Sequence, residues 1–248
     1  MTNILTTFMS IAQNPINGEG DALDISLQNA FASIPPDTPR SQRIELLAAS
    51  LVYLGNPTNP PDMMLRNGDA VQILRVPRDS LHLQLNSAYA MQKLYPTYPG
   101  LTSSARNCEP WSERDMIYAI GVEESRRLTT LWMIYGDCFA PSNATFERNS
   151  GDELRIYSPE TKAFYLPGRG SITNPIRLLT AAFNTQSVNF ESEPRLVAVM
   201  RAEKYLSLPE PDRTAIENAS GIEVHSVNLQ NPEDTTQPLA TKLLVLRP

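Results

Sequence analysis

Proline outnumbers glycine in this 248-residue chain by 21 residues to 11. Proline fixes its own φ and has no backbone N–H to donate, so a proline-rich chain makes rigid, extended connections between its elements. Scarce glycine leaves few positions where the backbone can close around a phosphate or a cofactor. The segment 56–62 (NPTNPPD) cannot continue a helix and is therefore predicted to be an extended connector.

Hydrophobic periodicity predicts helices over most of the first two-thirds of the chain. Apolar residues recur at helical spacing over 4–12, 23–34 and 44–54. Residues 80–85 alternate like a strand, but 81–95 also fit a helix, which we favour. The densest apolar segment, 111–135, starts with a capping-box-like serine and is predicted to be the central core helix or helix pair.

The remaining elements are predicted by turn and capping signals. Asn67-Gly68 between two apolar runs is the strongest hairpin signal and predicts paired strands over 63–76. Asn174-Pro175 opens one helix with proline at its first position. The other elements are helices over 192–206 and 212–219 and short strands near 154–166, 222–229 and 242–246.

These patterns together predict an α+β fold that is predominantly α-helical, with a few short antiparallel strands. The composition is that of a globular chain with a sizeable core, and no internal repeat or flexible linker divides it. We therefore expect one α-rich domain over 1–248, with extended terminal arms over 1–20 and 230–248.

The balance of basic residues is uneven, since 17 are arginine and four are lysine in a chain of net charge -6. The planar arginine guanidinium makes bidentate contacts with carboxylates and phosphates, often at interfaces. Net negative charge argues against coating nucleic acid by bulk charge, but it allows a local arginine-lined groove. This balance is typical of a protein that assembles or holds a partner.

Two arginine-bearing segments are candidate phosphate sites. Arg169 lies in the loop 167–171 (PGRGS) before a predicted helix, where backbone N–H groups could face an anion, although an ordinary turn explains the loop as well. Arg126 and Arg127 follow two glutamates and either belong to a solvated helix face or contact phosphates or a partner subunit.

The densest mixture of aromatic and arginine side chains lies over 95–118. Arg106 and Arg114 are candidates for phosphate contacts there, and Tyr95 and Tyr98 are candidates for stacking on bases. Packing of the same aromatic side chains beneath a proline-rich loop is the alternative.

No motif identifies a catalytic centre, a metal or a cofactor. The two histidines, His82 and His225, lie far apart, and Cys108 and Cys138 match no zinc spacing. A nucleotide-binding loop with its lysine and a GxSxG elbow are both missing. We therefore expect no catalytic residue, metal or cofactor, although a site of dispersed residues cannot be read from the sequence.

The hypothesis that follows is a self-assembling structural protein, such as a viral coat or nucleocapsid subunit that packages RNA through arginine. Its expected partners are copies of itself and single-stranded RNA. Without a signal peptide or membrane segment, we expect an intracellular or virion location. The alternatives are an enzyme with a dispersed Asp/Glu/Arg/Tyr site and a protein-binding adaptor.

Overall fold

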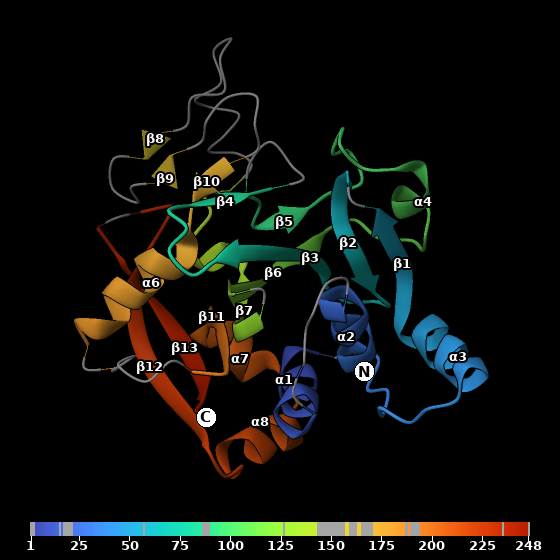
Figure 1. Ribbon diagram of the computed structural model, residues 1–248. Helices are drawn as coiled ribbons and strands as arrows, with labels where there is room; N and C mark the ends of the chain where they lie inside the picture. Colours follow the sequence, from blue (N-terminus) through green and yellow to red (C-terminus); the bar gives the residue numbers. More distant parts are fainter. Residues whose placement is uncertain are drawn as a thin grey trace.

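A mixed β-sheet, not a helical bundle, forms the centre of the protein in the computed structural model (Figure 1). The structure describes residues 3–14, 16, 22–56, 58–85, 90–125, 127–142, 157–158, 163–164, 171–186, 188, 194–234 and 236–247. Nine strands make up the main sheet in the order β1-β2-β3-β6-β7-β11-β13-β12, with β5 pairing to β6. The prediction of a predominantly α-helical fold is therefore wrong.

The strands of this sheet are β1 (Leu51–Asn56), β2 (Asn59–Leu65), β3 (Ala70–Pro77), β5 (Lys93–Leu94), β6 (Arg114–Glu124), β7 (Arg127–Tyr135), β11 (Leu196–Arg201), β12 (Ile222–Gln230) and β13 (Pro238–Leu246). Two small sheets pair β4 (His82–Gln84) with β10 (Ser171–Thr173) and β8 (Tyr157–Ser158) with β9 (Ala163–Phe164). The helices are α1 (Ile4–Gln13), α2 (Ala22–Phe31), α3 (Arg40–Ser50), α4 (Ser103–Arg106), α6 (Pro175–Asn184), α7 (Ala202–Ser207), α8 (Glu210–Glu217) and the 3-10 turn η1 (Gly136–Cys138).

The predicted central helix over 111–135 is instead the antiparallel pair β6 and β7. Most residues from Met116 to Tyr135 along these two strands are buried, because both faces of the sheet are covered. A strand buried on both faces reads as a continuous apolar run, and periodicity alone cannot separate such a run from a buried helix. The strands reverse direction near Ser125, which has φ 52°.

Four other predictions differ from the structure, and in three of them a segment predicted to be a helix contains a strand. The helix predicted over 44–54 ends at Ser50, and the chain continues as β1. The connector predicted over 56–62 contributes its second half to β2, and the favoured helix over 81–95 is replaced by the strands β4 and β5. The helix predicted over 192–206 is half strand, since β11 precedes α7.

Elements with strong local signals are confirmed. β2 and β3 form the predicted hairpin, with Asn67 in the left-handed region at φ 50°. The side chain of Asn174 caps α6 by accepting the Ile176 N–H at 3.1 Å. The strands β8, β9, β12 and β13 and the helices α1, α2 and α8 also lie where the sequence predicts them.

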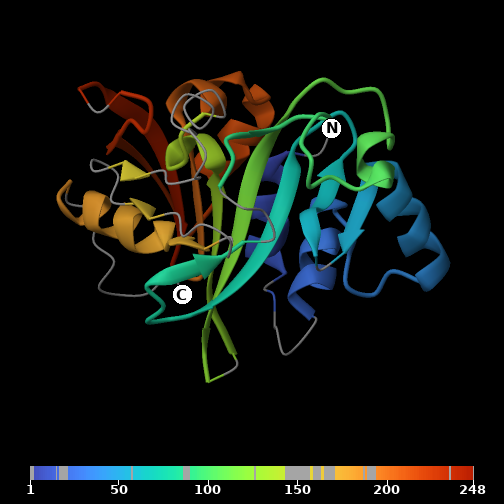
Figure 2. The ribbon, with the colours of Figure 1, turned by 90° about the horizontal axis from the view of Figure 1, so that it is seen from above.

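Both predicted terminal arms contribute to the core. α1 buries Ile4, Leu5 and Phe8 completely and packs against α2, α8 and β11. β13 lies inside the sheet between β11 and β12 (Figure 1). Seen from above, α3 lies at the β1 end of the sheet, and α6 lies toward the opposite end (Figure 2). No helix in the described part of the chain has the length and apolar character needed to cross a bilayer.

Candidate functional site: the Asp62 pocket

Two of the predicted phosphate-binding arginines make contacts within the chain. Arg106 donates to the carbonyl oxygens of Pro96 (2.7 Å) and Tyr98 (3.2 Å). Arg114 is buried, donates to the Leu65 carbonyl at 2.6 Å and forms an ion pair with Glu109. These contacts tie loops to the sheet.

The other predicted site residues do not gather into one groove in the described structure. Arg127 is exposed at the start of β7, paired in register with Glu124. Tyr95 and Tyr98 are both half-buried, and Tyr98 packs on the core. Arg126 and Arg169 lie outside the described residues. Contact of any of these residues with nucleic acid stays a prediction.

A different charged cavity lies where α2, β1, β2 and β3 meet. We call it the Asp62 pocket; its volume is about 330 Å³. Four elements contribute to its lining. The lining residues are Asp24 and Gln28 from α2, Gly55 and Asn56 from β1, Asp62 from β2, and Ile73 and Arg75 from β3.

Asp62 lies where the ladder between β2 and β3 ends. The strands pair at Met64↔Ala70 and Met63↔Val71, and no further pair follows. Beyond this point the Asp62 carboxylate accepts the backbone N–H of Ile73 at 2.5 Å. A side chain therefore holds together two strands that have begun to separate, and the separation leaves room for the cavity.

Burial raises the pKa of Asp62 from 3.8 to about 6. The Ile73 N–H opposes this rise by stabilising the carboxylate, whereas the negative charge of Asp24 adds to it. The two carboxylates are thus close enough to affect each other's charge. A perturbed carboxyl group in a cleft beside a second charged group is typical of a functional site.

Arg75 is the only cationic side chain among the described lining residues. Its guanidinium lies 3.5 Å from the Asp24 carboxylate and 4.0 Å from that of Glu123. The Arg75 side chain is 29% exposed, so it can be reached from solvent. The pocket therefore combines two carboxylates with one guanidinium.

Oxygen donors in this pocket fit a hard divalent cation such as Mg²⁺. Carboxylates are supplied by Asp24 and Asp62 and an amide oxygen by Gln28, whereas the Asn56 amide oxygen already accepts hydrogen bonds from Thr58 and Asn59. The described lining residues include no histidine or cysteine, the softer nitrogen and sulfur ligands. Within the described ranges, no three His, Cys, Asp or Glu side chains form a cation-binding group. Mg²⁺ commonly takes only one or two carboxylates and completes its shell with water and substrate phosphate, so this donor set fits.

A buried polar side chain, Gln72, lies on β3 one position before the pocket residue Ile73. Gln72 is fully buried, and neither its side-chain oxygen nor its side-chain nitrogen has a hydrogen-bond partner in the described structure. Side chains alternate along a strand, so Gln72 points to the opposite side of the sheet from the pocket residues Ile73 and Arg75.

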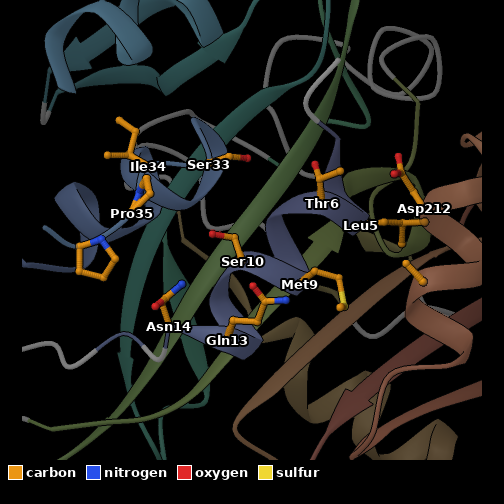
Figure 3. A pocket seen from close by; sticks show the side chains of 12 residues that line it. Leu5, Thr6, Met9, Ser10, Gln13, Asn14, Ser33, Ile34, Pro35 and Asp212 are labelled. Atoms are coloured by element: carbon orange, nitrogen blue, oxygen red, sulfur yellow. The ribbon is translucent and has the colours of Figure 1, made fainter. Parts of the chain in front are cut away.

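A larger cavity of about 470 Å³ lies between α1, the 33–36 segment and α8 (Figure 3). Among the described residues of its lining, one side chain is titratable, Asp212, which accepts a hydrogen bond from the Asn3 side-chain amide at 2.7 Å. Catalysis and charge recognition need convergent ionisable groups. Of these two cavities, the Asp62 pocket is therefore the better candidate site despite its smaller volume.

The mixed sheet and its charged pocket define an α/β protein with a candidate site for a ligand or substrate. The chain belongs to the NgoPII restriction endonuclease family, whose model matches residues 1–154. This range includes every residue that lines the Asp62 pocket. The chain is also 27% identical, over 98% of its length and 98% of the relative's, to the type II restriction enzyme NgoPII of Neisseria gonorrhoeae. No solved structure matches the chain.

Family membership corrects the functional hypothesis. A coat or nucleocapsid subunit that packages RNA is wrong, and so are the capsid and virion assignments, because the matching family consists of restriction endonucleases. The enzyme with a dispersed site, kept as an alternative, fits these findings better. The sequence offered no local signal for the pocket, because Asp24 lies on a helix and Asp62 in a proline-rich segment far along the chain.

Proposed function

We propose that this protein is a DNA endonuclease that hydrolyses phosphodiester bonds in the Asp62 pocket. Support comes from the family to which the chain belongs and from the name of its relative, a type II restriction enzyme. The observation that carries the proposal is that the Asp24 and Asp62 carboxylates line the same surface cavity, where the charge of Asp24 acts on Asp62. Duplex DNA replaces RNA as the expected nucleic-acid partner.

Phosphodiester hydrolysis needs a water to add to phosphorus and an ester oxygen to leave. Asp62 and Asp24 would hold a divalent cation, with the amide oxygen of Gln28 beside them. When bound, such a cation supplies a Lewis acid for a phosphate oxygen and lowers the pKa of a water molecule. The backbone N–H of Ile73 fixes one Asp62 oxygen, which orients the other oxygen of that carboxylate.

The test is incubation of the purified protein with phage DNA in Mg²⁺ and, separately, in EDTA. Discrete fragments in Mg²⁺ alone, lost in Asp62→Asn and Asp24→Asn, are expected. Asp37→Asn is the matched control because Asp37 is exposed and lies outside the pocket. Undigested DNA, or cleavage that survives both pocket substitutions, would contradict the proposal.

This function favours a homodimer. One pocket per chain serves one strand, whereas two-fold symmetry presents two equivalent pockets to the two strands of a duplex. Sedimentation of the purified protein should therefore give a dimer. A monomer that remains monomeric on DNA would contradict this part of the proposal.

A further inference from the structure

Arg75 is held between two acids at the edge of the Asp62 pocket. Its guanidinium pairs with Asp24 at 3.5 Å and with Glu123 at 4.0 Å. Neither contact is deeply buried, since the Asp24 side chain is 46% exposed and that of Glu123 is 31% exposed. Exposed ion pairs of this kind are weak and can be exchanged for a better partner.

A phosphate is the better partner for a guanidinium that lines a nucleic-acid site. Arginine binds phosphate through two parallel N–H···O bonds, which a single contact to one carboxylate oxygen at 3.5 Å does not match. As long as Asp24 keeps its full negative charge, however, it attracts Arg75 and repels the DNA backbone. The two effects of Asp24 act together against phosphate binding.

Asp24 interacts with both Arg75 and Asp62, which connects the ion pair to the cation ligands. The same carboxylate pairs with Arg75 and acts electrostatically on Asp62. Once both carboxylates ligate a divalent cation, Asp24 no longer offers Arg75 a net negative partner, and the cation repels the guanidinium. Glu123, at the end of β6, still keeps Arg75 beside the pocket.

We propose that Arg75 is the phosphate-binding residue of the Asp62 pocket and that Asp24 controls its availability, so that cation and DNA bind cooperatively. This inference rests on the proposed function, because it requires DNA to enter the pocket. Asp24 thereby has two roles, as cation ligand and as the group that occupies Arg75 when no cation is bound.

The experiment measures DNA affinity and not cleavage. A fluorescein-labelled duplex pool of random sequence is titrated with protein in EDTA and in Ca²⁺, which takes the same oxygen ligands as Mg²⁺. The wild-type protein should bind about 5- to 150-fold more tightly in Ca²⁺, the usual range of coupling between two ligands. Asp24→Asn should bind in EDTA more tightly than the wild type, by a factor in the same range.

Loss of a negative charge tightens DNA binding by itself, so a matched control is needed. Glu124 pairs with Arg78 at 3.3 Å, with both side chains about half exposed, and neither residue lines the pocket. Glu124→Gln removes the same charge from a comparable ion pair. The gain for Asp24→Asn should exceed that for Glu124→Gln and should disappear in the Asp24→Asn/Arg75→Gln double variant.

The outcomes that differ from these expectations separate the further inference from the proposed function. Equal gains for Asp24→Asn and Glu124→Gln, or a gain that persists without Arg75, would overturn the inference and leave the proposed function standing. A wild-type protein that binds no DNA in either buffer would overturn both. Far-UV circular dichroism of each variant checks that its fold is intact, and these conservative surface substitutions should leave the wild-type spectrum unchanged.

Discussion

At the scale of one residue, Asp62 shows a conflict between function and stability. Its pKa of about 6 lies above the ordinary value of 3.8 because burial penalises the charged carboxylate. Below pH 3.8 the folded and unfolded chains both carry the proton, and the shift has no effect. Between about pH 3.8 and 6 the unfolded chain releases this proton while the folded chain keeps it, so the folded chain loses stability relative to the unfolded one, and above pH 6 the loss stays constant.

We therefore expect Asp62→Asn to abolish cleavage and yet to stabilise the fold. The asparagine oxygen can still accept the Ile73 N–H, and no buried charge remains. The gain in the free energy of unfolding should be about 2 kcal/mol at pH 8 and should shrink as the pH falls to 5. Urea unfolding at both pH values checks this prediction, and a gain that does not change with pH would contradict it.

Gln72 is a second residue whose environment opposes stability. Burying an amide without hydrogen-bond partners costs about 1–3 kcal/mol. Gln72→Met keeps a similar volume and should raise the free energy of unfolding by an amount in that range. Thr241→Val is the control, because the buried Thr241 hydroxyl donates to the Val227 carbonyl at 2.8 Å and should cost about 1 kcal/mol when lost. Destabilisation of similar size in both variants would contradict the prediction.

At the scale of one element, β1 supports the pocket through close backbone packing. A Cβ at Gly55 would lie 2.3 Å from the carbonyl oxygen of Pro61, the residue before Asp62. That oxygen belongs to the backbone, so the strands themselves would have to move. The glycine is therefore required by the approach of β1 to β2 and not by its own dihedral angles.

Gly55→Ala should accordingly displace Asp62 and slow DNA cleavage, besides lowering the free energy of unfolding by about 1–3 kcal/mol. Leu54→Ala is the control, because Leu54 precedes it on the same strand, is 49% exposed and does not line the pocket. Cleavage rates and urea unfolding of both variants provide the measurement. Wild-type cleavage by Gly55→Ala would show that the pocket tolerates a wider strand spacing.

At the scale of the whole molecule, the C-terminal segment completes the sheet. β13 pairs with β11 on one side and with β12 on the other, and Leu243, Leu244 and Val245 are fully buried. A chain that ends at Gln237 should therefore lose its cooperative thermal transition, whereas a chain shortened only by Pro248 should keep it. A truncated chain that still melts cooperatively would support a terminal arm and contradict the interior position of β13.

The organisation of the chain as a single domain stays a prediction, whereas its class is corrected from mainly helical to mixed. The difference arises largely in β6 and β7. Their apolar residues satisfy helical spacing and strand pairing equally well, and the choice depends on partners elsewhere in the chain. β3 and β11 pair with them in parallel, and a parallel pair needs a long connection that leaves no local turn signal.

Local chemistry in the sequence by itself determined the β2–β3 hairpin, the cap of α6 and the helix α8 before Gly221. Each depends on residues a few positions apart, such as Asn67 in its turn or Asn174 at its cap. Only the tertiary structure decided that Asp24, Asp62 and Arg75 share one pocket, because a helix and two strands must first pack before these charges meet. Pairings between distant segments obey no short-range spacing, and burial, which alters the pKa of Asp62, exists only after they form.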